Sequence, residues 1–294
     1  AGLAAAIYAA RARLSFLVLE KMPLSGGQIL NTYEVENYPG IPTIGGFELG
    51  MKLREHAEHQ GTEMIHIEVR HISLEEQGRI KVLYTDGKEY RARTVILAMG
   101  AKYRTLGIPG EKELTGMGVS YCATCDGAFF RGRKVAVVGG GDVAAEDALF
   151  LARGCEKVYL IHRRDQLRAA GVLQEKLRAA ENVELVWNAA VEEITGEAFV
   201  TGVQLLDTQT KEERFVAADG IFIAVGIQPV SESFKSLVKT DEAGYICAGE
   251  DCCTSVPGIF AVGDVRTKKL RQIVTAVADG ANAVSSVQEY FQTR

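Results

Sequence analysis

The residues best suited to chemistry stand in the stretch GVSYCATCDGAFF at positions 118–130, where Cys122 and Cys125 are two residues apart and Asp126 follows. A Cys-x-x-Cys pair can supply half of a zinc site, form a structural disulfide or act as a redox-active dithiol. A structural zinc site needs four ligands, usually as two spaced pairs. Four other cysteines are present and none makes a second such pair: Cys155, Cys247, Cys252 and Cys253.

The cysteine count bears on the two remaining alternatives. Six cysteines in 294 residues are too few for a disulfide-stapled secreted scaffold, so a reducing cytoplasm is the expected compartment. A purely structural disulfide is unusual there, which favours a redox dithiol. Asp126 then has two interpretations. It is a general acid that protonates a leaving thiolate, or it belongs to an Asp-Gly turn.

Composition excludes several other classes of protein. The net charge of −5 and the lack of a long basic run disfavour nucleic-acid binding. No apolar run reaches the roughly 18 residues of a membrane span, and 47% hydrophobic residues suffice for a core. The opening AGLAAAIYAA lacks the basic start of a signal peptide and is expected to be a helix.

An internal repeat indicates the elements that position the dithiol. Residues 2–20 and 144–162 align without a gap, each as a helix of small residues, a loop and an apolar strand. The second copy is preceded by KVAVVGGGDVA, a buried-type strand with Gly139, Gly141 and Ala144 in dinucleotide-binding spacing. Such a turn brings a pyrophosphate onto the N-terminus of the next helix. By the same alignment Gly2 is the third glycine of a first fingerprint, so we expect about a dozen residues to precede Ala1.

The residue that ends the second strand of such a unit meets the adenosine ribose. In the first copy it is Glu20, whose carboxylate accepts hydrogen bonds from ribose hydroxyls and repels a 2′-phosphate. In the second copy it is His162 in HRRDQLR, where three arginines follow: Arg163, Arg164 and Arg168. Guanidinium groups at this position predict NADPH, although a solvated helix start is the alternative.

Two further apolar strands, TVILAMGA (94–101) and GIFIAVGI (220–227), end at Gly100 and Gly226. Each glycine is either a plain strand end or a point where the backbone passes close to a nucleotide. Their matching places in the two copies favour the second interpretation.

The chain resembles the bacterial low-molecular-weight thioredoxin reductases, which use FAD and NADPH. The blocks that carry the likeness are SGGQ, CATCDGAFF, VVGGGDVAAEDA, HRRDQLR, VPGIFAVGDV and RQIVTAVADG, in order along the chain. The resemblance implies an α/β fold with two Rossmann-like domains, the NADPH domain (106–227) being inserted in a discontinuous FAD domain (1–105 and 228–294). It also implies a homodimer with thioredoxin as its partner.

By this resemblance, two sets of residues contact the cofactors. The FAD set is Gly2, Glu20, Gly27, Gln28, Asn37, Gly100, Asp264, Arg271, Gln272 and Ile273. The NADPH set is Gly139, Gly141, Asp142, Val143, His162, Arg163, Arg164 and Arg168. Val143 stands where the family usually has a serine, which removes one hydroxyl near the pyrophosphate. Cys252 and Cys253 replace a usual non-cysteine pair and are either free thiols or a regulatory vicinal pair.

The resemblance further implies a cycle in which NADPH reduces FAD, FAD reduces the Cys122–Cys125 disulfide at Cys125, and Cys122 attacks the partner's disulfide. Asp126 supplies the proton. Because NADPH and the dithiol share a domain and must both reach one flavin, we expect that domain to rotate, with Gly110, Gly116 and Gly226 as hinge candidates. The alternatives are a glutaredoxin-like or peroxiredoxin-system partner and, more distantly, a non-enzymatic redox sensor.

Overall fold

In the computed structural model, which describes residues 1–32 and 35–293, the apolar stretch KVAVVG forms strand β9 (Lys134–Gly139) at the centre of a parallel sheet. The sheet order is β11-β10-β9-β15-β8. The other strands are β8 (Val119–Ser120), β10 (Lys157–Ile161), β11 (Val183–Val186) and β15 (Gly220–Ala224). This confirms the strand predicted from the fingerprint and places its second strand, β10, directly beside it.

The two faces of this sheet are covered by different layers. Val135 and Val137 of β9 face a cluster with helices α4 (Asp142–Leu151) and α5 (Gly171–Ala179). Ala136 and Val138 face an antiparallel sheet made of β12 (Ala189–Gly196), β13 (Val200–Asp207) and β14 (Glu213–Ala217). Burial on both faces explains why β9 is continuously apolar rather than alternating.

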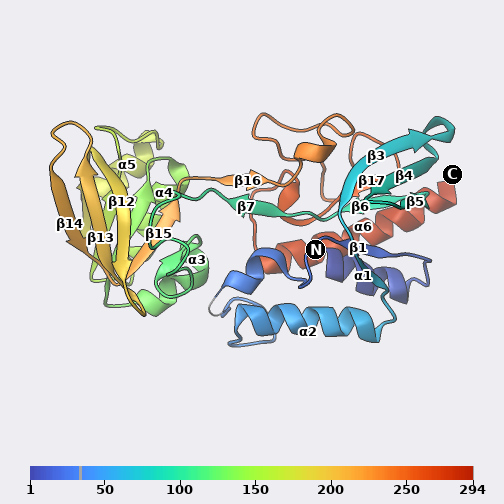
Figure 1. Cartoon of the computed structure of the whole chain (residues 1–294), viewed down its shortest axis with the longest axis horizontal. Coiled ribbons are helices and arrows are strands. Elements are labelled where there is room, and N and C mark those ends of the chain that lie inside the picture. Colours follow the sequence, from blue (N-terminus) through green and yellow to red (C-terminus); the bar gives the residue numbers. More distant parts are fainter. Residues whose placement is uncertain (33–34, 294) are drawn as a thin grey trace.

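The sheet and its covering layers form one unit of the structure. A second unit contains the first repeat copy, residues 2–20 (Figure 1). Its helices are α1 (Gly2–Arg11), α2 (Gly46–His59) and α6 (Ile273–Thr293). Parallel pairs join β1 (Val18–Glu20) to β2 (Met64–His66) and β6 (Val95–Leu97) to β17 (Ile259–Ala261). An antiparallel sheet contains β3 (Val69–Glu75), β4 (Ile80–Thr85) and β5 (Glu89–Ala92). Gly280 lets α6 approach α1, because a Cβ there would lie 2.6 Å from the Ala1 oxygen.

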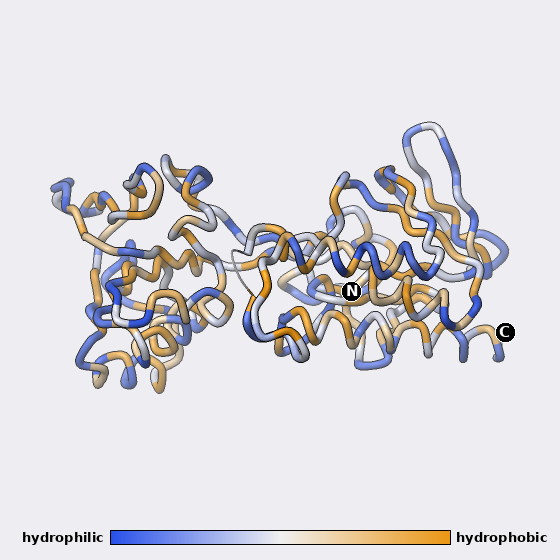
Figure 2. Tube along the Cα trace, turned by 90° about the horizontal axis from the view of Figure 1, so that it is seen from below, coloured by the Kyte–Doolittle hydropathy of each residue, from blue (hydrophilic) through white to orange (hydrophobic). Residues whose placement is uncertain are grey.

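Two strands connect the units across a narrow waist that is visible from both directions (Figures 1 and 2). They are β7 (Ala101–Tyr103) and β16 (Ile227–Pro229), and they pair antiparallel, with Tyr103 opposite Ile227. The Arg104 N–H donates to the Gly226 oxygen at 2.9 Å and extends this ladder. In Figure 2 the helical coils alternate between hydrophobic and hydrophilic residues, as expected of helices with one face on a core.

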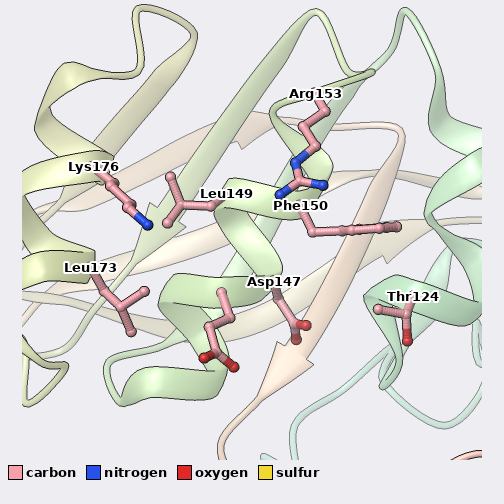
Figure 3. A pocket seen from close by; sticks show the side chains of 8 residues that line it. Thr124, Asp147, Leu149, Phe150, Arg153, Leu173 and Lys176 are labelled. Carbon is pink, nitrogen blue, oxygen red and sulfur yellow. The ribbon is translucent and has the colours of Figure 1, made fainter.

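A hollow of about 530 Å³ lies between α4, α5 and the short helix α3 (Ala123–Asp126) (Figure 3). Its lining is Thr124, Glu146, Asp147, Leu149, Phe150, Arg153, Leu173 and Lys176. Burial, aided by the neighbouring Glu146 charge, raises the pKa of Asp147 to about 7. None of these residues belongs to the sets predicted from the sequence.

Candidate active site at the junction of the two units

The predicted dithiol is a disulfide. It lies in the unit that contains the sheet β11-β10-β9-β15-β8, at the end that faces the unit with α1, α2 and α6. Cys122 and Cys125 are bonded, with their Cα atoms 5.3 Å apart. Cys122 precedes α3, and its C=O accepts the N–H groups of Cys125 and Asp126, so the pair is held in one helical turn. This confirms the disulfide expected from the spacing.

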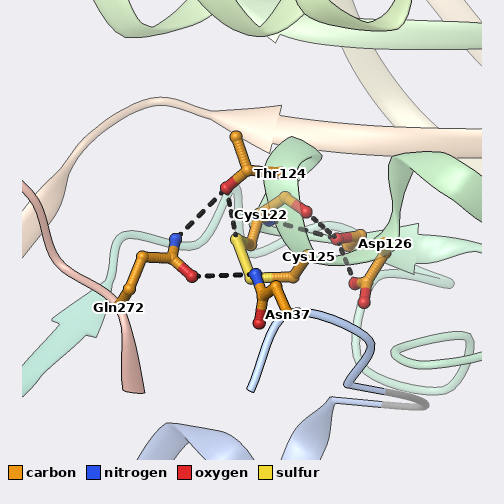
Figure 4. Close-up of a disulfide and its surroundings, with 7 residues drawn as sticks. Asn37, Cys122, Thr124, Cys125, Asp126 and Gln272 are labelled. Carbon is orange, nitrogen blue, oxygen red and sulfur yellow. Dashed lines mark hydrogen bonds between the residues drawn. A yellow bond between two sulfur atoms is a disulfide. The ribbon is translucent and has the colours of Figure 1, made fainter. Parts of the chain in front are cut away.

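Asp126 lies on the same turn, beside the disulfide (Figure 4). Its Oδ2 accepts a 2.5 Å hydrogen bond from the Ser120 hydroxyl, which also accepts the Cys122 N–H at 3.1 Å. Its Oδ1 is buried and has no hydrogen-bond partner within the described part of the chain. Burial raises the pKa of Asp126, and the Ser120 hydrogen bond only partly opposes that shift. The carboxyl therefore holds a proton more readily than an exposed aspartate does.

Side chains of the second unit meet the disulfide turn. The Gln272 amide, just before α6, donates to the Thr124 hydroxyl, and Asn37 donates to the Gln272 oxygen (Figure 4). The rings of Tyr103 and Tyr121 stack with centroids 5.2 Å apart. Burial, followed by the charges of Asp264 and Asp126, raises the pKa of Tyr103. The disulfide turn thus contacts Gln272, one of the predicted flavin residues.

The predicted FAD set falls into two groups. Gly2 begins α1, where a Cβ would lie 3.3 Å from Ala98 Cβ, and Glu20 ends β1 with Oε1 accepting the Met22 N–H at 3.0 Å. The others are near the junction: Gly27 (φ +64°), Gln28, Asn37, Gly100 (φ +68°), Asp264, Arg271, Gln272 and Ile273. Gln28 donates to the Ala101 oxygen at the start of β7.

Asp264 and Arg271 carry the clearest sign of a polar ligand in this group. Asp264 Oδ1 and Arg271 Nε are buried and lack hydrogen-bond partners among residues 1–32 and 35–293. Burial raises the pKa of Asp264, and the Arg271 guanidinium lies 3.9 Å over the Tyr245 ring. Buried polar atoms are normally paired, so these residues fit a ligand that supplies hydroxyl and acceptor groups.

The predicted NADPH set lies around the turn between β9 and α4. A Cβ on Gly139 would lie 2.5 Å from the Ala224 oxygen, whereas Gly141 has nothing within 4 Å and begins α4 as its N-cap. Asp142 Oδ1 accepts the Ala170 N–H at 2.7 Å, and Val143 is exposed. Open space over Gly141 at a helix N-terminus fits a phosphate.

The structure separates His162 from the three arginines that follow it. His162 is 7% exposed and packs beneath the turn, since its ring would lie 2.2 Å from a Cβ on Gly140. Its Nε2 has no partner in the described residues, and burial lowers its pKa. The arginines are exposed and form no ion pair within the described ranges: Arg163, Arg164 and Arg168.

The remaining cysteines are separate thiols. Cys252 is buried and burial raises its pKa to about 11, whereas the neighbouring Cys253 is exposed. No disulfide joins them. The described residues contain no cluster of three or more His, Cys, Asp or Glu side chains able to hold a metal. Among the same residues, no helix is both long and apolar enough to cross a membrane.

One carboxylate near the site was not predicted. Glu111 is 3% exposed and accepts the N–H groups of Leu106 and Gly107, just after β7, at 2.9 and 2.7 Å. It also accepts the Tyr121 hydroxyl at 2.8 Å. Glu111 therefore ties one crossing segment to the residue before Cys122. The only sequence signal was its place in the glycine-rich crossing GIPGEKELTGMG.

Glu111→Ala is expected to lower the free energy of unfolding by about 2–4 kcal/mol, because three partly buried hydrogen bonds lose their buried, charged acceptor. Urea unfolding checks this value. The exposed Glu113 provides the matched control, and Glu113→Ala is expected to change the free energy by less than about 0.5 kcal/mol. Equal effects of the two substitutions would contradict the assignment.

Comparison with known proteins places this geometry in a family. The model of the pyridine nucleotide-disulphide oxidoreductase family matches residues 1–280. The chain belongs to this family. The family resemblance inferred from the sequence is therefore confirmed, and so are the two-domain α/β fold and the assignment as an oxidoreductase.

The relatives share nearly the whole chain. The thioredoxin reductase of Bacillus subtilis is 48% identical over 293 residues, covering 99% of this chain and 92% of the relative. The thioredoxin reductase structure from Streptococcus pyogenes has a TM-score of 0.94 at 47% identity, covering 100% and 95% of the two chains. The structure of Lactococcus lactis thioredoxin reductase in its FR conformation has a TM-score of 0.66 at 44% identity, covering 100% of this chain and 96% of that one.

Proposed function

We propose that this member of the family reduces the disulfide of thioredoxin with electrons from NADPH, through FAD and the Cys122–Cys125 disulfide. The observation that carries the proposal is the position of that disulfide. It lies in the unit that contains the dinucleotide-binding turn, and Thr124 between the two cysteines accepts a hydrogen bond from Gln272 of the other unit. A disulfide with a purely structural role gains nothing from standing at a junction that also holds unpartnered polar atoms.

The residues present fit both cofactors. Asp264, Arg271 and the start of α6 would hold FAD, together with Gly2 and Glu20 at its adenosine end. The turn before α4 and the exposed arginines would hold NADPH, with the guanidinium groups on its 2′-phosphate. When bound, the flavin supplies a path for two electrons from the nicotinamide to the disulfide.

The dithiol acts by exchange. The Cys122 thiolate attacks one sulfur of the partner's disulfide, that S–S bond breaks, and a partner thiolate leaves as the mixed disulfide forms. The Cys125 thiolate then attacks Cys122 Sγ, which re-forms the disulfide and releases the second partner thiolate. Asp126 is the group placed to deliver a proton at the disulfide turn, because it stands on that turn with a raised pKa and one free oxygen.

Asp126→Asn is expected to slow thioredoxin reduction by about 10- to 100-fold, because the amide cannot donate a proton to a leaving thiolate. In the parent protein the supporting form is the protonated carboxyl, so its contribution falls as pH rises through its elevated pKa. The variant should lose that dependence. Rapid mixing of the pre-reduced protein with thioredoxin at a series of pH values measures the rate and its pH dependence. The surface substitution Asp86→Asn is the control. An unaltered pH profile would argue for the turn interpretation.

The domain limits proposed from the sequence are 1–105 and 228–294 for FAD and 106–227 for NADPH. Rotation of one unit against the other is supported by two structures of similar identity, 47% and 44%, whose TM-scores are 0.94 and 0.66. Gly226 (φ +119°) suits a hinge, since a Cβ there would meet only Arg104 side-chain atoms, from 3.5 Å. Gly110 suits it less, because a Cβ there would lie 1.9 Å from the Ile194 oxygen.

We further propose a homodimer in the cytoplasm.

The deciding experiment for the proposed function is NADPH consumption by the flavin-loaded protein with thioredoxin, compared with a glutaredoxin-like protein or a peroxiredoxin as acceptor. Rapid turnover with thioredoxin alone is the expected result. Preference for another acceptor would replace the partner, and no flavin reduction by NADPH would remove the enzyme assignment.

A further inference from the structure

A chain of three hydrogen bonds ends on a reactive sulfur. Asn37 Nδ2 lies 3.1 Å from Gln272 Oε1, and Gln272 Nε2 lies 3.2 Å from Thr124 Oγ1. Thr124 Oγ1 lies 3.5 Å from Cys122 Sγ. Figure 4 shows the three side chains leading to the disulfide one after another. We refer to Asn37, Gln272 and Thr124 as the relay.

The relay has a direction. Asn37 donates an amide hydrogen to the Gln272 oxygen, and Gln272 donates one of its own to the Thr124 oxygen. A threonine hydroxyl has one hydrogen and two lone pairs. With one lone pair occupied by Gln272, the Thr124 hydrogen is free to point to Cys122 Sγ. Each bond polarises the next, so the relay makes Thr124 a better donor than an isolated hydroxyl.

The relay crosses between the units at one step, the hydrogen bond from Gln272 to Thr124. Asn37 belongs to the loop before α2, Gln272 immediately precedes α6, and Thr124 lies on the disulfide turn. The backbone N–H of Gln272 bonds Thr275 Oγ1 at 3.2 Å, which holds its Cα in place independently of the side chain. A rotation of the units would separate Thr124 from Gln272 while leaving the Thr124–Cys122 contact intact.

We propose that Thr124 is a positioning residue that stabilises the thiolate of Cys122, and that Gln272 and Asn37 strengthen this effect only while the units are arranged as in this structure. The inference rests on the proposed role of Cys122 as the thiol that attacks the partner. A disulfide sulfur is a weak acceptor, whereas a thiolate forms a charge-assisted hydrogen bond. Reduction therefore tightens the relay, and rotation loosens it and makes the thiolate more nucleophilic.

The test measures the Cys122 thiol by itself. In a Cys125→Ser background, the rate of iodoacetamide labelling of the Cys122 peptide is followed against pH by mass spectrometry. Thr124→Val is expected to raise the midpoint of that profile by about one pH unit, the worth of one hydrogen bond to a charged sulfur. Thr124→Ser should restore it. The exposed Cys253 thiol, labelled in the same samples, is the internal control and should keep its profile.

A double-mutant cycle tests the relay itself. Gln272→Leu alone should raise the midpoint by less than Thr124→Val does, and it should add nothing when combined with Thr124→Val, because Gln272 acts through Thr124. Flavin content is matched between samples, since Gln272 lies at the proposed flavin site. An unshifted Thr124→Val profile overturns the proposal, as does an unshifted Gln272→Leu profile or an effect of Gln272→Leu that persists in the double variant. The labelling assay contains neither NADPH nor thioredoxin. Failure of the proposed function would therefore appear in the NADPH-consumption experiment and not in this one.

Discussion

Cys125→Ser is expected to reduce steady-state thioredoxin reduction to background while Cys122 still forms a covalent adduct with the partner. The remaining thiol can open the partner's disulfide, but no second thiol is available to release the mixed disulfide. The adduct should therefore accumulate when the thiol form of the variant is mixed with oxidised thioredoxin. Intact-protein mass spectrometry without reductant detects it, and NADPH consumption measures the loss of turnover.

The chain offers a matched control for this experiment. Cys253 is exposed and free, and it lies outside the disulfide turn. Cys253→Ser is expected to turn over at the parent rate and to leave the adduct of Cys125→Ser unchanged. Residual turnover by Cys125→Ser, or an adduct that disappears with Cys253→Ser, would contradict the proposed division of labour between Cys122 and Cys125.

The second large effect concerns the nucleotide. Arg163→Ala with Arg164→Ala is expected to lower kcat/KM for NADPH by about 10²–10⁴-fold, because each guanidinium–phosphate hydrogen bond contributes about 1.5–3 kcal/mol. The kcat/KM for NADH, which has no 2′-phosphate, should hardly change. Steady-state kinetics with both nucleotides give the ratio.

Both side chains are exposed and lie after β10, so their removal leaves the core of the sheet intact. Arg178→Ala, an exposed arginine on α5, is the control for loss of positive charge in the same unit. An equal loss for NADPH and NADH would mean that the arginines do not recognise the 2′-phosphate and are a solvated helix start.

Local features of the site were predictable because their determinants are contiguous in sequence. The unit β9–turn–α4–β10 follows from a continuous apolar strand, glycines at the turn and small residues at Ala144, Ala145 and Ala148, all of which are buried. The disulfide of Cys122 and Cys125 follows from spacing alone once zinc has no other ligands. In each case the pattern and the contact lie within a few residues of one another.

Contacts between distant segments were not predictable in the same way. The Gln272–Thr124 hydrogen bond joins residues 148 positions apart, and its geometry depends on how the two units are turned. Glu111 stands among charged neighbours in the sequence, and only the fold brings Tyr121 and the crossing segment onto its carboxylate. His162 illustrates a third case. The alignment of the two repeat copies located it at the end of a strand, but it did not show that the His162 ring fills the space under Gly140.

The pairing of β7 with β16 has a consequence for the modularity of the chain. Tyr103 and Ile227 are opposite one another. The segment between them therefore leaves the unit with α1, α2 and α6, called here the host, and returns to it through adjacent strands. Strands paired in this way lie about 5 Å apart, so the host would need only a very short loop to close the gap. Closing so short a gap costs little chain entropy. We therefore expect that the segment between β7 and β16 can be removed without preventing the rest of the chain from folding.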